Sequence, residues 1–198
     1  MGERAENDFY PTPAPLAVAI CKRLSKVLDA GHFDVIEPSA GAGAFVRPIR
    51  ELWGLQPLIA IDIEPDVKAL RDAGADDIIK ADWVEWVRTY KIDGPTLVIG
   101  NPPFSLAHEH ISAGLDYLLP GSHICFLLKL NFFGGKEREK AFWRQGQLRY
   151  LIPIIGRPSF IKGEKASNDT NEYGVFIWEV GYSGKPEILF PHIIWKGT

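Results

Sequence analysis

The stretch that decides the fold is Val35-Ile36-Glu37-Pro38-Ser39-Ala40-Gly41-Ala42-Gly43-Ala44-Phe45. It leads from the apolar residues of a strand through small residues into a helix. The two glycines lack a Cβ, so the backbone can come close to a ligand there. In an open α/β sheet, such a turn is where a cofactor usually binds, although a Gly-x-Gly pair also occurs in plain tight turns.

The rest of the chain predicts an α/β domain. It has 198 residues, 46% of them hydrophobic and 24% charged, which is typical of one compact domain. Short apolar runs alternate with amphipathic stretches, so we expect a mostly parallel sheet with helices between the strands. The expected strands are 33–37, 58–62, 77–80, 96–100, 123–129, 150–155 and 173–180, the last two forming an antiparallel edge pair. The expected helices are 15–30, 44–52, 65–73, 83–89, 106–119 and 136–145.

Several classes of protein are disfavoured by the composition. No run of eighteen apolar residues is present, and the first residues include Glu3, Glu6 and Asp8, so neither a membrane span nor a secretion signal is predicted. We therefore expect a cytoplasmic protein without a membrane partner. Cys21 and Cys125 lie far apart in apolar runs, which favours buried thiols over a disulfide, and no metal site is predicted.

The charge is unevenly distributed. The formal net charge is −3, but residues 129–165 hold nine Lys and Arg against three Glu. A local basic face can attract a polyanion even when the whole molecule is mildly acidic, because salt screens distant charges. An ordinary solvated helix face is the alternative reading of residues 136–144.

Acidic residues end two of the predicted strands. Asp62 comes nineteen residues after Gly43, where a carboxylate can accept both hydroxyl protons of a ribose. Asp82 and Trp83 follow the third strand, where they can bond to a base and pack against it; a helix N-cap and a core aromatic are their alternative roles. Val46 replaces the third glycine of a dinucleotide site, which favours an adenosine-containing ligand without a pyrophosphate.

The predicted chemistry depends on Asn101-Pro102-Pro103-Phe104, directly after the strand 96–100. The prolines fix their own φ at about −65° and keep Asn101 out of the helical region, so the loop is stiff. A rigid amide at the carboxyl end of a central strand is poorly placed for turn formation alone. It is well placed to touch a ligand beside the glycine turn.

In this order, the motifs resemble those of the S-adenosylmethionine-dependent amino-methyltransferases, above all the DNA adenine-N6 enzymes of phages and bacterial restriction-modification systems. The resemblance implies a Rossmann-like class I methyltransferase fold, with a seven-stranded mostly parallel sheet and an antiparallel edge pair. We expect one methyltransferase domain over 1–198. Here the sequence departs from the resemblance: sequence-specific members of the family usually carry a separate target-recognition region, and these 198 residues leave no room for such a domain. The cofactor would be S-adenosyl-L-methionine, held by Tyr10, Thr12, Pro13, Glu37, Ser39, Ala40, Gly41, Gly43, Asp62, Ile63, Asp82, Trp83 and Asn101.

The tetrapeptide has a chemical rationale of its own. An exocyclic amino group is a poor nucleophile because its lone pair is delocalised into the ring. The Asn101 side-chain oxygen and the Pro102 carbonyl can each accept one N–H and aim the lone pair at the methyl group, while Phe104 stacks on the base. Pro103 stiffens the loop, and positioning supplies most of the rate without a general base.

The expected substrate is DNA, with adenine as the methylated base. Only residues 131–146 and 156–172 remain as substrate loops, so we expect short or degenerate site recognition, a single-stranded substrate or a partner that supplies recognition. Basic residues would hold phosphates without reading sequence. The candidate substrate-binding residues are Phe104, Lys129, Lys136, Arg138, Arg157 and Phe160.

Other functions stay open at this point. An RNA adenine or guanine amino-methyltransferase would use the same tetrapeptide. A protein glutamine N5-methyltransferase is also similar, although that family typically has Tyr in the fourth position and a helical domain ahead of the glycine motif. The non-enzymatic alternative is a nucleic-acid-binding module that has lost catalysis. The sequence predicts no oligomeric state.

Overall fold

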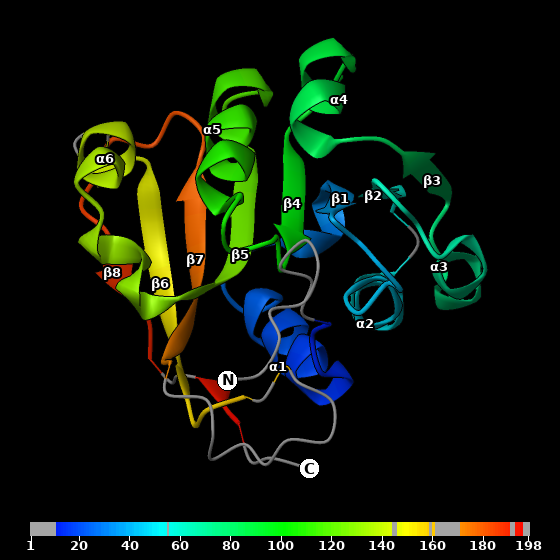
Figure 1. Ribbon diagram of the computed structural model, residues 1–198, viewed down its shortest axis with the longest axis horizontal. Helices are drawn as coiled ribbons and strands as arrows, with labels where there is room; N and C mark the ends of the chain where they lie inside the picture. Colours follow the sequence, from blue (N-terminus) through cyan, green and yellow to red (C-terminus); the bar gives the residue numbers. More distant parts are fainter. Residues whose placement is uncertain are drawn as a thin grey trace.

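A single sheet forms the centre of the molecule. The computed structural model describes residues 11–54, 56–143, 146–158, 160, 171–190 and 193–195. The strands in these residues are β1 (Asp34–Pro38), β2 (Leu58–Asp62), β3 (Asp77–Lys80), β4 (Thr96–Gly100), β5 (His123–Lys129), β6 (Leu148–Ile155), β7 (Tyr173–Glu179), β8 (Glu187–Ile188) and β9 (Ile193–Ile194). Their order is β3-β2-β1-β4-β5-β7-β6-β8, with β9 also on β6 (Figure 1). The first five strands in this order are parallel, and β7 is antiparallel to both β5 and β6.

Helices cover both faces of this sheet (Figure 1). The main helices are α1 (Ala14–Leu24), α2 (Val46–Trp53), α3 (Val67–Ala73), α4 (Trp83–Thr89), α5 (Ala107–Tyr117) and α6 (Lys136–Arg138). Helices α1, α2 and α3 share one apolar cluster on one face, and α4 and α5 share a second cluster on the other. Shorter helical turns are η2 (Ala30–His32), η3 (Leu130–Gly134) and η4 (Glu139–Trp143). No helix in the described part of the chain has the length and hydrophobicity of a membrane span.

The parallel strands place the predicted motifs side by side. In the register between β1 and β4, Ile36 lies opposite Val98, so the two strands end together. A Cβ on Gly100 would stand 3.1 Å from the Pro38 carbonyl oxygen, which explains why glycine ends β4. On the other side of β1, Pro38 pairs with Ile61. The ends of β2, β1 and β4 therefore bring together the three segments on which the predicted site depends.

The sheet differs from the prediction in its far half. Seven strands were expected and the described residues form nine, because the tail adds β8 and β9. These strands have two residues each, too few to show an alternating pattern. The predicted antiparallel pair of β6 and β7 is present, but it is not the edge: β7 lies between β5 and β6, and β6 carries the short strands.

Two predicted helices are shorter than expected. The helix expected over 15–30 ends at Leu24, where the Lys26 N–H bonds to the Arg23 carbonyl in a tighter turn. The helix expected over 136–145 is only α6, followed by the wider π-type turn η4. Both rings of that turn, Phe142 and Trp143, lie 6.1 Å from Phe132. Aromatic packing has outweighed the regular helical repeat there.

Candidate active site

The glycine turn between β1 and α2 has an unusual backbone. Three of its residues have positive φ: Ser39 (59°), Gly41 (52°) and Gly43 (78°). A Cβ on Gly43 would stand 2.9 Å from a Leu70 methyl carbon, so this glycine is needed for close packing against α3. Ser39 is the one non-glycine residue with positive φ in the described chain, a conformation that costs about 1–2 kcal/mol. Such strain persists only where neighbouring groups hold it.

Glu37 lies buried beneath the turn. Its side chain is 2% exposed, and its Oε1 accepts a 3.4 Å hydrogen bond from the Phe45 N–H. Its Oε2 has no hydrogen-bond partner among the described residues. Burial raises the pKa of Glu37 to about 8, against the lowering effect of the backbone N–H groups. The free protein therefore favours the protonated carboxyl at neutral pH, and a cation bound beside Glu37 would favour the ionised form, which accepts hydrogen bonds.

Asp62 ends β2 and supports the same turn. Its Oδ2 accepts the Gly41 N–H at 2.8 Å, and its Oδ1 accepts the Glu64 N–H at 2.8 Å. The carboxylate is half-buried, and the following Ile63 is 53% exposed. A carboxylate oxygen can accept more than one hydrogen bond, so these contacts orient Asp62 without exhausting it.

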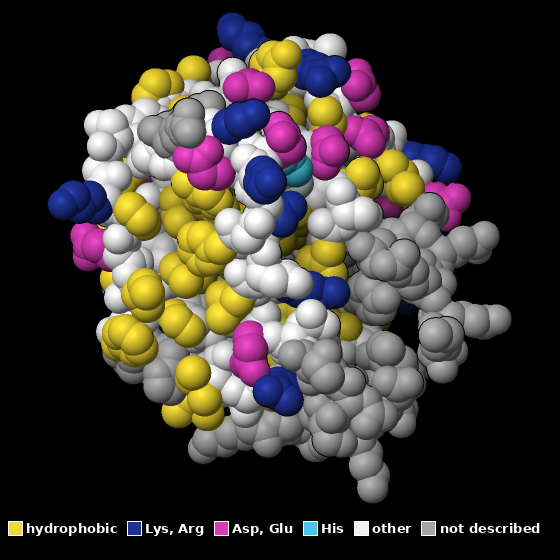
Figure 2. All heavy atoms as spheres, turned by 60° about the vertical axis from the view of Figure 1, so that its left-hand side comes forward, with side chains coloured by type: hydrophobic (Ala, Val, Ile, Leu, Met, Phe, Trp, Pro, Cys, Tyr) yellow, Lys and Arg dark blue, Asp and Glu magenta, His cyan; other side chains and the backbone are white. Residues whose placement is uncertain are grey.

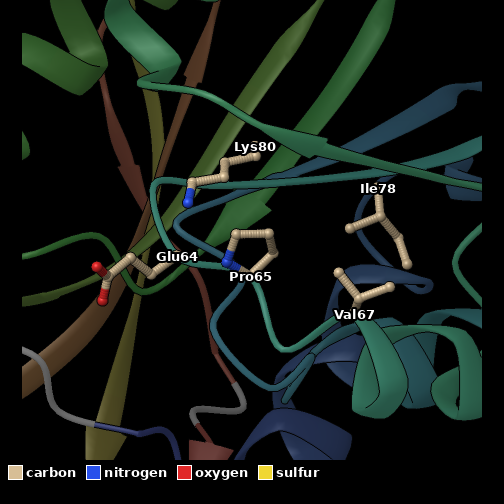
Figure 3. A pocket seen from close by; sticks show the side chains of 5 residues that line it. All are labelled: Glu64, Pro65, Val67, Ile78 and Lys80. Atoms are coloured by element: carbon tan, nitrogen blue, oxygen red, sulfur yellow. The ribbon is translucent and has the colours of Figure 1, made fainter.

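An open hollow of about 450 Å³ lies just beyond Asp62, between the start of α3 and the edge strand β3 (Figure 3). Pro65 and Val67 line it from one side and Ile78 from the other, with Glu64 and Lys80 at its margin. In the sheet, Lys80 pairs with Asp62. The hollow therefore lies next to the strand end that carries Asp62, and its lining is partly apolar and partly charged.

In the structure, Asp82 is a helix N-cap and Trp83 is a core aromatic, the alternative roles given for them in the sequence analysis. Asp82 is the N-cap of α4: its Oδ1 accepts the N–H groups of Val84 and Glu85 at 2.7 and 3.2 Å. Its side chain is exposed. Trp83 is 2% exposed, and its indole N–H donates to the His110 carbonyl at 3.1 Å. Trp83 therefore packs in the core between α4 and α5.

His110 is a member of this region that sequence reasoning missed. It lies on α5, is 4% exposed, and places Nε2 3.1 Å from Ser39 Oγ and Nδ1 3.0 Å from the Leu106 carbonyl. A carbonyl only accepts, so Nδ1 carries the proton. Burial lowers the pKa of His110 and favours the neutral ring, whose Nε2 then accepts the Ser39 hydroxyl proton. No spacing in the sequence connects two residues 71 positions apart.

The tetrapeptide follows β4 directly beside the turn. Asn101, Pro103 and Phe104 are half-buried and Pro102 is buried. The Pro103 carbonyl accepts the Leu106 N–H at 2.9 Å, which joins the loop to the start of α5. Because β4 ends beside Pro38, Asn101 leaves the sheet next to the glycine turn.

Aromatic and cationic groups surround Phe104. The Lys129 ammonium lies 4.8 Å from the centre of the Phe104 ring, within the range of a cation–π contact. Phe160 meets the ring edge-on at 6.3 Å, and Tyr173 lies 6.0 Å away. Phe160 is only 6% exposed, so it supports Phe104 from the core side in this structure. Tyr173, 2% exposed, was not among the predicted residues, because nothing marks one aromatic of a buried strand as special.

The remaining predicted residues lie in several places. Tyr10 is outside the described residues. Thr12 is buried and Pro13 is the N-cap of α1, while Ala40 is buried and donates its N–H to the Ile61 carbonyl at 3.0 Å.

The structure does not bring all the basic candidates together. Lys136 is exposed on α6. The Arg138 guanidinium lies over the Phe132 ring and donates to the backbone carbonyl of Phe132. Arg157 forms an ion pair with Glu172 at 2.9 Å.

Comparison with known proteins places this arrangement in context. No family model matches the chain. A type II methyltransferase, M.CvrRI of Paramecium bursaria Chlorella virus XZ-6E, is 28% identical over 103 residues, which are 52% of this chain and 26% of that protein. The chain thus spans about a quarter of this relative's length.

Solved structures share the fold over most of the chain. A Listeria monocytogenes protein assigned to the class I S-adenosylmethionine-dependent methyltransferases has a TM-score of 0.65 at 16% identity, over 98% of this chain and 67% of that one. A type I restriction-modification methyltransferase subunit of Streptococcus thermophilus has a TM-score of 0.66 at 14% identity, over 88% and 45%. The 23S rRNA methyltransferase ErmE has a TM-score of 0.60 at 14% identity, over 90% and 71%. The fold is therefore the class I methyltransferase fold, as predicted.

The class I fold and the methyltransferase relatives imply S-adenosylmethionine as the cofactor, and they agree with the resemblance to DNA amino-methyltransferases. The residues of the site fit such a group. Ribose hydroxyls are donors that the Asp62 carboxylate can accept. The cationic amine of the methionine part suits Glu37 Oε2, the buried oxygen that has no partner among the described residues.

Proposed function

We propose that this protein transfers a methyl group from S-adenosylmethionine to the exocyclic N6 amino group of adenine in DNA. The observation that carries the proposal is the junction of β1 and β4, where Asn101 leaves the sheet beside the glycine turn. An amide at this point can hold an amino group next to a ligand on the turn. The relatives in restriction-modification systems favour DNA as the substrate.

Each residue then has a defined task. Asp62 would hold the ribose and Glu37 the cationic amine of the cofactor, which supplies a methyl group already activated on a sulfonium. The Asn101 side-chain oxygen and the Pro102 carbonyl would each accept one N–H of the target amine, so that its lone pair is directed at the methyl group. Phe104 would stack on the base and exclude water. The amine would form its N–C bond as the bond between methyl and sulfur breaks, with that electron pair staying on the sulfur, and the methylated amine would then release one proton to solvent. The work of the protein is orientation, which needs no general base.

The nucleic acid would approach along the side that carries α6, β6 and β8. Figure 2 brings this side forward: Lys and Arg side chains lie along its middle with acidic ones among them, beside a broad apolar area. Lys136 and Lys140 are exposed here. Such a surface binds phosphates without reading sequence, so binding should weaken steeply as salt is raised. A base buried in a duplex would have to be extruded to reach Phe104.

RNA is the second candidate substrate, because an rRNA methyltransferase has the same fold. The amino group of an RNA base presents the same chemistry to Asn101 and Phe104. An enzyme that acts on RNA would differ from one that acts on DNA by its contacts to the 2′-hydroxyl of the ribose.

The decisive experiment offers the protein labelled S-adenosylmethionine with duplex DNA, single-stranded DNA, RNA or protein, and identifies the methylated product. We expect N6-methyl-2′-deoxyadenosine, from DNA. Asn101→Ala should lower the rate by about 10²–10³-fold, the effect of losing one transition-state hydrogen bond, while the variant still folds and binds S-adenosylmethionine. Label in RNA alone, or on a glutamine side chain, would contradict the proposal.

A further inference from the structure

A chain of three hydrogen bonds connects the tetrapeptide to the glycine turn through His110. The Leu106 N–H donates to the Pro103 carbonyl at 2.9 Å, the Leu106 carbonyl accepts the His110 Nδ1 proton at 3.0 Å, and His110 Nε2 accepts the Ser39 hydroxyl at 3.1 Å. Pro103 belongs to the tetrapeptide and Ser39 to the turn. The buried His110 ring thus bonds to the turn directly and is linked to the tetrapeptide through the backbone of Leu106.

Ser39, at one end of this series of hydrogen bonds, has a strained backbone. Its φ of 59° is a conformation that L side chains rarely adopt, and a strained residue needs a contact that holds it. The hydroxyl bond to His110 is such a contact. The turn amides beyond it are also bonded: those of Ala40, Gly41 and Gly43 donate to the Ile61 carbonyl, Asp62 Oδ2 and the Ala40 carbonyl. A release of Ser39 would therefore loosen the bonded turn that follows it.

Packing and a backbone hydrogen bond hold His110 itself in place. The ring is 4% exposed and meets Phe126 at 6.4 Å, and the backbone carbonyl of His110 accepts the Trp83 indole N–H at 3.1 Å. The ring cannot follow Ser39 if the turn moves, because α4 and α5 hold it in place. A strained turn is thus tied to a rigid helix.

We propose that His110 is a positioning residue, which holds Ser39 in its left-handed conformation and thereby fixes the glycine turn relative to the Asn101 loop. In this role His110 would act through Ser39 and not on a ligand. The inference rests on the proposed function for the identity of the cofactor, while the contact itself is independent of that function. The consequence is that cofactor affinity depends on a side chain of the helix behind the tetrapeptide.

Two substitutions of His110 test its hydrogen bonds to Ser39 and to Leu106 one at a time. His110→Gln places an amide oxygen where Nε2 stood and can still accept from Ser39. His110→Asn places an amide N–H where Nδ1 stood and can still donate to Leu106, but it does not reach Ser39. The same pair at His108, which lies on the same helix and packs against Phe142 at 4.8 Å, is the matched control.

Two quantities are measured for each variant. Hydrogen exchange of the Ala40, Gly41 and Gly43 amides in the free protein reports on the turn, and calorimetric titration with S-adenosylmethionine reports on the cofactor. We expect His110→Asn to speed exchange and weaken binding by about tenfold each, as for one buried hydrogen bond. His110→Gln should restore most of both, and neither His108 variant should change them.

The outcomes distinguish the two proposals. Equal effects of His110→Asn and His110→Gln, or no effect on the turn amides, would show that His110 only fills space and would overturn the inference. If the wild-type protein bound no S-adenosylmethionine while the exchange difference remained, the proposed function would fail and the positioning role would stand. Ser39→Ala combined with His110→Asn should be no worse than either alone, because both remove the same bond.

Discussion

The two halves of the sheet use their side chains differently. At the ends of β2 and β1, the carboxylates of Asp62 and Glu37 accept backbone N–H groups of the turns, and Glu37 is buried with one oxygen that has no partner among the described residues. Around β5, β7 and β6, aromatic rings pack on one another instead. That cluster includes Phe132, Phe142, Trp143, Phe176 and Trp178. The difference teaches that the parallel half carries the ligand chemistry at its strand ends, while the antiparallel half supplies stability.

The sharpest test of this division is Trp178→Ala. Trp178 is fully buried on β7 and stacks with Phe176 at 5.7 Å, so its loss leaves a large cavity. We expect the free energy of unfolding to fall by about 3–5 kcal/mol, measured in urea, with cofactor affinity of the folded protein unchanged. Trp86→Ala, which removes a half-buried ring stacked on Tyr90, should cost less. A comparable loss of cofactor affinity in Trp178→Ala would show that the halves are not separate.

Glu37 gives an effect of comparable size, and it depends on pH. The folded pKa of about 8 lies above the usual value of 4.5, so the folded protein favours the protonated carboxyl. The resulting stability is fully present below about pH 4.5 and is lost as pH rises through 8. The free energy of unfolding should fall by about 1.4 kcal/mol per pH unit in between.

The measurement is urea unfolding of the wild type and of Glu37→Gln at several values between pH 5 and 8.5. Glutamine does not titrate, so the difference between the two curves isolates the carboxyl from all other groups. We expect the stability of the wild type relative to Glu37→Gln to decrease steadily over this range. Parallel curves would mean that the buried carboxyl has an ordinary pKa. The parallel half would then lose its most distinctive electrostatic feature.

The parallel half was also the better predicted half. The bounds of β2, β3 and β4 were predicted residue by residue, and β1 was predicted one residue early, because their apolar runs are bounded by turn residues. In the other half only β5, which pairs with β4, was predicted as well. The positions of Asp62 and Asn101 were predictable for a simple reason: parallel strands end at one edge of the sheet. The antiparallel half gave weaker signals, since β8 and β9 are too short to show a period and η4 follows aromatic packing.

The site residues that sequence reasoning could not find are those that act through the fold. His110 meets Ser39 across 71 positions, and Tyr173 meets Phe104 only because β7 lies beside β5. Arg138 was predicted to bind phosphate, but its guanidinium lies over Phe132. A sequence motif indicates which residues can contact a ligand. The contacts that hold those residues in place come from segments that only the strand order brings together.

Asp62→Asn tests the ligand chemistry of the parallel half at a smaller scale. Asparagine keeps the shape but loses the charge that strengthens bonds to ribose hydroxyls, and its NH2 group must face one of the two backbone N–H groups, of Gly41 or Glu64, that the carboxylate accepts. We expect S-adenosylmethionine to bind at least about tenfold more weakly by calorimetry. The control is Asp66→Asn, four residues further on, where the side chain caps α3 by accepting the Ala69 N–H at 3.0 Å. That variant should leave cofactor affinity unchanged. Equal losses in both would point to a general loosening of the β2–α3 connection.

The smallest expected effect concerns the surface beside the aromatic half. Lys136 and Lys140 are exposed, and each phosphate contact adds about 0.7–0.9 to the slope of log affinity against log salt. Replacing both with Ala should reduce that slope by about 1.5 for a DNA oligonucleotide and leave methylation at saturating DNA unchanged. Lys22→Ala with Lys26→Ala makes the same change in net charge at α1, on the opposite face of the sheet, and should leave the slope as it is. Because only position differs between the two pairs, an equal change in slope would mean that DNA senses the overall charge and that the antiparallel side is not its docking surface.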